Sequence, residues 1–149
     1  MAELIGDEVV SAVSRNIRAS FGIQEIKAIY KNLPQQNITK PYAFIHQVNA
    51  NHKNEMRNRA EWSFMLDVRV HPEDSRTDVQ TWARNIALKL IEAINIITIS
   101  GQAVKARSIE YKVEDNVLHF FVSYAFKVIK HTGDNPDMQT LTYGQHLKS

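Results

Sequence analysis

The sequence predicts an α+β fold in which one mostly antiparallel sheet carries two helices on one face. Two segments, residues 5–21 and 79–97, repeat their apolar side chains every three or four positions, as amphipathic helices do. Five other segments have the pattern of strands, with a period of two or, in the last of them, apolar side chains on both faces. The order along the chain is helix, three strands, helix, two strands. Placing both helices on the same side of the sheet buries the apolar faces and leaves the other face half-open for a partner.

The length of 149 residues fits one domain, and 44% hydrophobic with 23% charged residues is an ordinary globular composition. We divide the chain into a domain over residues 1–131 and a polar C-terminal tail over residues 132–149. The 18 basic and 16 acidic residues give a net charge of +2, which does not favour a nucleic-acid partner. There is no cysteine, which excludes disulfides and thiol nucleophiles. No segment reaches the ~20 apolar residues of a membrane helix, so we expect no membrane partner.

The first predicted helix is followed by a glycine and then by a change of period. Ile5, Val9, Val13 and Ile17 form its apolar stripe, and we expect Gly22 to end it in the left-handed conformation that glycine tolerates. Apolar and polar side chains alternate from residue 23 to 31, which predicts a strand. The polar segment 32–41 holds two prolines and is predicted to be a loop.

The next two strands, over residues 42–48 and 62–71, predict a long hairpin. Residues 49–59 between them are almost wholly polar, so we expect an exposed, charged and flexible tip. A solvated turn explains such charges. An electrostatic docking point explains them as well, since the tip would reach away from the core. The tip lacks the aromatic residues that stack on bases. The candidate docking residues are Lys53, Asn54, Arg57 and Arg59.

The second predicted helix carries one broad apolar stripe from Val79 to Ile97. Ser75 and Asp78, three residues apart, resemble a capping box at its start. We interpret the acidic residues before the helix as compensation for its dipole and not as a cation site. These residues are Glu73, Asp74 and Asp78.

The last two predicted strands form a second hairpin. Residues 103–113 make its first strand, and the turn residues Glu114, Asp115 and Asn116 connect it to a second strand from Val117 to Lys130. Both faces of that second strand are apolar. We therefore place it in the centre of the sheet.

No set of residues predicts catalysis, a metal site or a cofactor. Glu110 and Lys112 face the same way on a strand, and with Asp67 they could resemble a metal-dependent nuclease, which needs carboxylates that converge on one ion. Charges at a spacing of two are more simply the solvated face of a strand. The histidines are scattered, and no glycine-rich phosphate loop is present. We therefore expect no enzyme activity and no small-molecule substrate.

Three stretches resemble a known family: PYAFIHQV to EWSFMLDVRVHPED, IEAINIITISGQAVKA and VEDNVLHFFVSYAFKVIK. The chain is similar to the tail terminators of tailed bacteriophages and prophages, especially those of Gram-positive hosts. The piece DNVLHFFVSYAFKV carries the resemblance most specifically, because family members have a similar "dgvLHffvdY" pattern there. The resemblance covers residues 23–131.

The resemblance implies a structural protein of the virion without enzymatic activity. Such proteins form a ring, usually of six copies, on the last ring of the tail tube, where they stop its polymerisation and join it to head or neck proteins. The implied partners are copies of the chain itself, the tail tube protein and a head-completion or neck protein. The implied place is the tail–neck junction, after assembly in the host cytoplasm. Exposed sheet edges suit a ring, because neighbouring copies can pair along them.

Other functions remain open on the sequence alone. A minor head–tail adaptor or a tail-completion protein would share the fold and the ring. A nucleic-acid-binding module or a metal-dependent nuclease would differ, since it would bind DNA in a salt-dependent way or cleave it with a metal.

Overall fold

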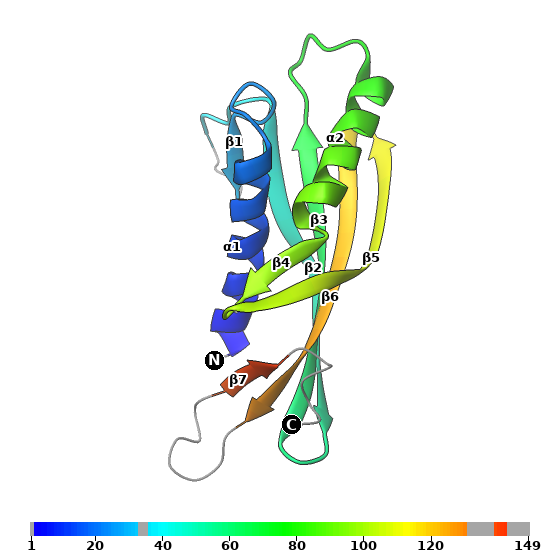
Figure 1. Cartoon of the computed structure of the whole chain (residues 1–149). Coiled ribbons are helices and arrows are strands. Elements are labelled where there is room, and N and C mark those ends of the chain that lie inside the picture. The colour runs from blue at the N-terminus through cyan, green and yellow to red at the C-terminus, as the bar shows by residue number, and fades with distance from the viewer. Residues whose placement is uncertain (1, 33–35, 131–138, 143–149) are drawn as a thin grey trace.

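The computed structural model describes residues 2–32, 36–130 and 139–142 and contains two helices and seven strands (Figure 1). The helices are α1 (Ala2–Ser20) and α2 (Val79–Ile94). The strands are β1 (Ala28–Tyr30), β2 (Tyr42–Glu55), β3 (Arg59–His71), β4 (Ile96–Ile99), β5 (Gln102–Glu114), β6 (Val117–Lys130) and β7 (Gln139–Thr142).

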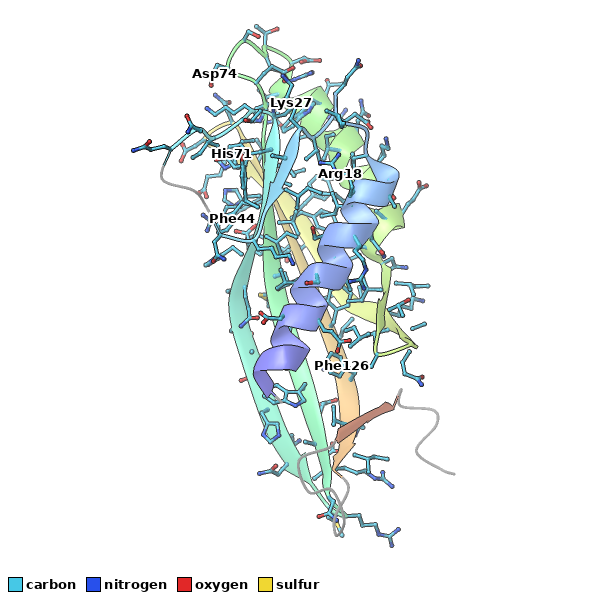
Figure 2. The ribbon with its side chains drawn as sticks, turned by 90° about the vertical axis from the view of Figure 1, so that its left-hand side faces the viewer. Arg18, Lys27, Phe44, His71, Asp74 and Phe126 are labelled. Atoms are coloured by element: carbon cyan, nitrogen blue, oxygen red, sulfur yellow. The ribbon has the colours of Figure 1, made fainter. Side chains whose placement is uncertain are left out.

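The strands form one sheet in the order β1-β2-β3-β6-β5-β4, and β7 pairs with the far part of β6. The pair β1–β2 is parallel, and all other pairs are antiparallel. Figures 1 and 2 show both helices on the same face of this sheet. The predicted α+β class, the helices on one face and the central place of β6 are therefore confirmed.

Strand β4 is a correction to the sequence prediction, which continued the second helix to Ile97. The helix ends at Ile94, and the next residues form a strand in which Ile97 and Ile99 are buried while Ile96 is 53% exposed. Three β-branched isoleucines and a threonine favour an extended chain. The prediction was wrong because Ile97 lies three positions after Ile94, a spacing that a helix would also produce.

The end of α1 also differs from the prediction. Gly22 does not take a positive φ, and its backbone carbonyl instead accepts a hydrogen bond from the amide of Ile26 at 3.0 Å. The Glu25 carboxylate accepts one from the Gly22 amide at 3.1 Å, and the Arg18 guanidinium donates to the Ile26 carbonyl at 2.9 Å. Side chains therefore hold this turn. The strand predicted from residue 23 is confined to Ala28–Tyr30, next to β2.

The predicted capping box before α2 is wrong. The helix begins at Val79, so Asp78 is itself the N-cap residue, and its side chain makes no capping hydrogen bond. Arg76 forms ion pairs with two of the neighbouring acidic residues, because its guanidinium donates to Glu73 at 2.7 Å and to Asp78 at 3.0 Å. The third acid, Asp74, pairs with Lys40 at 2.8 Å. Ion pairing between the side chains explains this acidic cluster.

The polar segment predicted as a flexible tip is mostly strand. Hairpin pairing continues to Glu55 opposite Arg59, so the turn is only Met56, Arg57 and Asn58. The prediction failed because this end of the hairpin extends past both helices (Figure 1). Where no core covers either face, a paired strand has no reason to alternate apolar and polar side chains. Of the predicted tail, the structure describes only β7, which pairs with β6.

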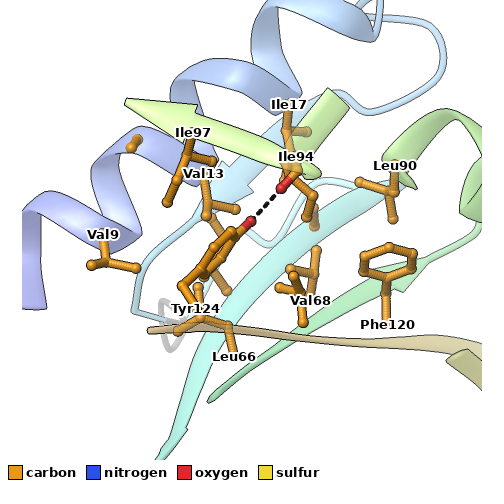
Figure 3. Packing of buried hydrophobic residues seen from close by; sticks show 14 of the residues in the cluster. Val9, Val13, Ile17, Leu66, Val68, Leu90, Ile94, Ile97, Phe120 and Tyr124 are labelled. Carbon is orange, nitrogen blue, oxygen red and sulfur yellow. Dashed lines mark hydrogen bonds between the residues drawn. The ribbon is translucent and has the colours of Figure 1, made fainter. Parts of the chain in front are cut away.

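The core lies between the helices and the sheet (Figure 3). Val9, Val13 and Ile17 of α1 reach the buried face of the sheet, where Tyr124 of β6 is fully buried. The Tyr124 hydroxyl donates a hydrogen bond to the carbonyl of Ile94, in the last turn of α2. A helix end leaves such carbonyls without a partner, so this bond ties α2 to the centre of the sheet. Burial raises the pKa of the Tyr124 hydroxyl well above its usual value.

Replacing the buried tyrosine tests this anchor. Tyr124→Phe is expected to lower the free energy of unfolding by about 1–3 kcal/mol at neutral pH, because the buried Ile94 carbonyl loses its donor. Urea denaturation followed by circular dichroism measures the change.

The same substitution has a signature in alkali. Because the pKa of Tyr124 is raised in the folded chain, wild-type stability is expected to fall as the pH rises above about 10, where the unfolded tyrosine ionises first. This alkaline loss should be smaller in Tyr124→Phe. Equal losses in both proteins would contradict the assignment of a buried, protonated hydroxyl.

Candidate assembly surfaces

The projecting end of the β2–β3 hairpin carries all four residues predicted as a docking point. Lys53 and Asn54 are exposed on β2, Arg57 is exposed in the turn, and Arg59 is half-buried at the start of β3. Met56 beside them is 82% exposed. The structure thus brings the predicted residues together at one end of the molecule. They do not form a single patch, because neighbouring residues of a strand face opposite sides of the sheet.

An ion pair fixes this hairpin to the rest of the sheet. The Lys127 ammonium of β6 donates to both carboxylate oxygens of Glu55, at 2.8 and 2.9 Å. This hydrogen bond is the main reason why the pKa of Glu55 is lowered, and the nearby charges of Lys53 and Arg59 lower it further. The ion pair therefore links the hairpin end to β6 in addition to the backbone pairing of the sheet.

The helix-free face of the sheet carries an unusual buried acid. Asp67 of β3 is 3% exposed, and its Oδ2 atom lies 2.9 Å from Nε of Arg69 and 3.1 Å from Nδ1 of His119. Its Oδ1 atom is buried without a hydrogen-bond partner among the described residues. The contact between Asp67 and His119 could not be predicted from the sequence, because the two residues lie on distant segments and meet only through the register of β3 against β6.

The geometry does not support the nuclease alternative. Asp67 and Glu110 both stand opposite Phe121 of β6, one on each side, so two strand spacings of about 4.8 Å separate their backbones. The Phe121 side chain lies between them on the same face. Ligands of one divalent ion must each come within about 2.6 Å of it. In the part of the chain that the structure describes, no three acidic or histidine side chains are grouped to hold a metal.

At the other end of the helix-free face, the His71 ring stacks on Tyr42 with centroids 4.4 Å apart. Desolvation lowers the pKa of His71, and the charges of Lys40, His119 and Arg69 lower it further. The folded chain therefore binds the His71 proton less tightly than the unfolded chain does.

This shift predicts a loss of stability in mild acid. As the pH falls below about 6.5, the unfolded histidine gains a proton more readily than folded His71, so the free energy of unfolding should decrease. Thermal unfolding between pH 7.5 and 5 measures the effect. His71→Gln should flatten the dependence, and His52→Gln, on the exposed hairpin, should not. A slope that survives His71→Gln would contradict the assignment.

Two stretches of sheet edge have no described strand beside them. On β2, the partner strand β1 covers only Tyr42–Phe44, which leaves residues 46–55 open on their outer side. On β5, the partner strand β4 covers only Gln102–Lys105, which leaves residues 108–114 open. Tyr111 on this second stretch is 40% exposed. Such edges are sites where another chain can add a strand.

Comparison with known proteins decides the family. The family model described as phage tail terminator protein matches residues 8–136. The chain belongs to the phage tail terminator family. The match contains α2, six of the strands and the larger part of α1, so the resemblance predicted from three stretches of sequence is confirmed and extends into α1.

Other comparisons add little to this assignment. No curated protein is significantly similar in sequence to the chain. One solved structure covers 81% of this chain and 98% of its own length, at 14% identity and a TM-score of 0.29, which carries no argument about fold or function.

Family membership makes the chain a structural protein of a phage tail and therefore a virion component. Neither α1 nor α2 is both long and apolar enough to cross a bilayer, within the ranges that the structure describes. Surfaces that contact other tail proteins are then the functional parts of the molecule. The two open edges and the projecting hairpin are the candidates.

Proposed function

We propose that this terminator forms a closed ring, of six copies, that caps the tail tube at the tail–neck junction. The ring stops polymerisation of the tube protein and offers its other surface to a head-completion or neck protein. Membership of the tail terminator family over residues 8–136 is the observation that carries this proposal. Assembly takes place in the host cytoplasm.

The two open sheet edges support a ring of limited size. They lie at the two opposite edges of the sheet and differ in sequence. When the β5 edge of one copy contacts the β2 edge of the next, the contact therefore joins two different surfaces. Head-to-tail contacts of this kind give a closed ring when the rotation between copies closes. A closed ring has used both edges of every copy and cannot grow further. Termination then follows from geometry without any reaction.

The projecting hairpin is the part that we assign to the contact with the tube or the neck. Its turn carries Arg57 and the exposed Met56, and Arg59 follows at once. A methionine fits irregular apolar surfaces, and the arginines can pair with acidic side chains. Lys53 and Asn54 stand further from the turn, on the same hairpin.

Loss of the gene product tests the proposal as a whole. Without this chain, tails are expected to exceed their normal length or to remain unjoined to heads, because nothing caps the tube. Electron microscopy of lysates measures both features, and expression of the chain from a plasmid is the control. Tails of normal length that join heads in the absence of the chain would contradict the proposal.

The hairpin assignment has its own test. Arg57→Glu with Arg59→Glu is expected to leave the circular dichroism spectrum unchanged and to lengthen tails, because the contact loses its charges. Arg84→Glu with Lys105→Glu is the matched control, since both residues are exposed and lie away from the hairpin. Unchanged tail lengths in the Arg57 and Arg59 variant would reject the assignment.

A further inference from the structure

We propose that the ring closes by strand pairing: residues 108–114 of β5 in one copy pair antiparallel with residues 49–55 of β2 in the next copy. The inference rests on the proposed ring and names the surfaces that form it. The partner is a second copy of this chain. The sheets of neighbouring copies would then join into one continuous wall.

Both edges present free backbone groups at defined residues. The β5–β6 turn has two residues with positive φ, Asp115 and Asn116, so Glu114 and Val117 close it as a hydrogen-bonded pair. Counting back from such a pair, every second residue of β5 directs its N–H and C=O groups toward β6, and the residues between them direct theirs to the other side. The backbone groups of Ile109, Tyr111 and Val113 therefore point away from β6. By the same rule, Glu55 pairs with Arg59 across the other turn, and the outward residues of β2 are Ala50, His52 and Asn54.

The direction of the two strands suits a ring. Strand β2 is antiparallel to β3, β3 to β6, and β6 to β5, so β2 and β5 run in opposite directions within one copy. Rotation about a ring axis keeps the direction of each strand relative to that axis. The β2 strand of the next copy therefore arrives antiparallel to β5, which continues the existing pattern across the boundary.

One register matches the two edges completely. It places Tyr111 opposite His52 of the next copy, so outward backbone groups meet and both sheet faces stay continuous. Moving β2 by two residues one way would bring the irregular step between Gln47 and Asn49 into the pair. Moving it the other way would bring in the β2–β3 turn. In the matching register, the exposed carboxylate of Glu110 lies opposite the ammonium of Lys53 on the helix-free face, which adds a favourable cross-strand pair.

The register also sets how the strands lean in the ring. Within one copy, Tyr111 is level with Ile45 of β2, through Phe120 and Val68. Pairing with His52 of the next copy shifts the strands by about six residues, or about 20 Å, over four strands that span about 19 Å. The strands then tilt by about 45° from the ring axis. Closed barrels have tilts of about 35–45°, so the stagger of the two edges is the one that closure requires.

The sense of the tilt decides which face points inward. Figure 1 views the upper part of the sheet from the helix side, with β2 to the left of β5 and the open part of β5 at the upper right, whereas the open part of β2 runs down to the lower end of the molecule. Because the upper stretch of β5 pairs with the lower stretch of β2, the next copy on the right is displaced upward along the strands. When all copies are set at the same height in a ring, the strands must lean, and seen from the helices they rise to the right. Strand twist gives barrels this right-handed tilt when seen from outside. The helices then lie outside, and the helix-free face lines the channel.

Cysteine cross-linking tests the register, because the natural chain has no cysteine. Tails are assembled with Lys53→Cys and Glu110→Cys in the same chain, oxidised mildly and run on a non-reducing gel. Within one copy, the two positions lie about 14 Å apart across β3 and β6 and about 20 Å apart along the strands, too far for a disulfide, whereas opposed residues of neighbouring strands are close enough. The expected result is a ladder from dimer up to the ring number.

Lys53→Cys with Tyr111→Cys is the matched control, because these side chains face opposite sides of the sheet and should leave monomers only. Electron cryomicroscopy of wild-type tails is the second measurement, with the helices expected on the outer wall. Monomers in both cysteine variants, or helices on the inner wall, would overturn the strand pairing and leave the proposed ring intact. Tails without any terminal ring would overturn the proposed function itself.

Discussion

Strand β6 is the element on which the rest of the structure depends. Its apolar face carries Phe120 and Tyr124 into the core, and Tyr124 holds the end of α2 through the Ile94 carbonyl. One edge of β6 pairs with the whole length of β3. The other edge is divided, because β5 pairs with it only from Ala106 to Glu114 and β7 pairs with its far end, from Lys127 to Lys130. Strand β5 is open only at one end of the molecule because β4 covers the outer side of its first residues.

That arrangement links folding to assembly. The part of β5 near Lys105 is paired with β4, and the part of β2 near Tyr42 is paired with β1. In an untilted ring, the open stretch of each strand would face the covered stretch of its neighbour, so the two could not pair. The open stretches of β2 and β5 can meet only if neighbouring copies are staggered along the strands. The short strands β1 and β4 thus act as stops that select one way of pairing copies, which is how soluble proteins limit edge-to-edge contacts.

The sequence predicted the elements whose signals are local. The β5–β6 hairpin was predictable because Asp115 and Asn116 are residues that tolerate the positive φ of a tight turn. Both helices were predictable because one face of each meets the core. Strand β4 and the far half of the β2–β3 hairpin were not. Ile97 also fits a helical spacing, and the residues around His52 have no core beside them to impose alternation.

The candidate surfaces could be predicted only in part. The exposure of Lys53 and Arg57 could be predicted from their polar neighbours in the sequence. The open edges could not be predicted, because they depend on where the partner strands end, which no local pattern reveals.

The most direct test of strand pairing between copies is amide hydrogen exchange at Ile109, Tyr111 and Val113, whose N–H groups point away from β6. These amides should exchange quickly in the free chain and become protected in assembled tails. Equally fast exchange in both states would contradict a ring that closes through strand pairing.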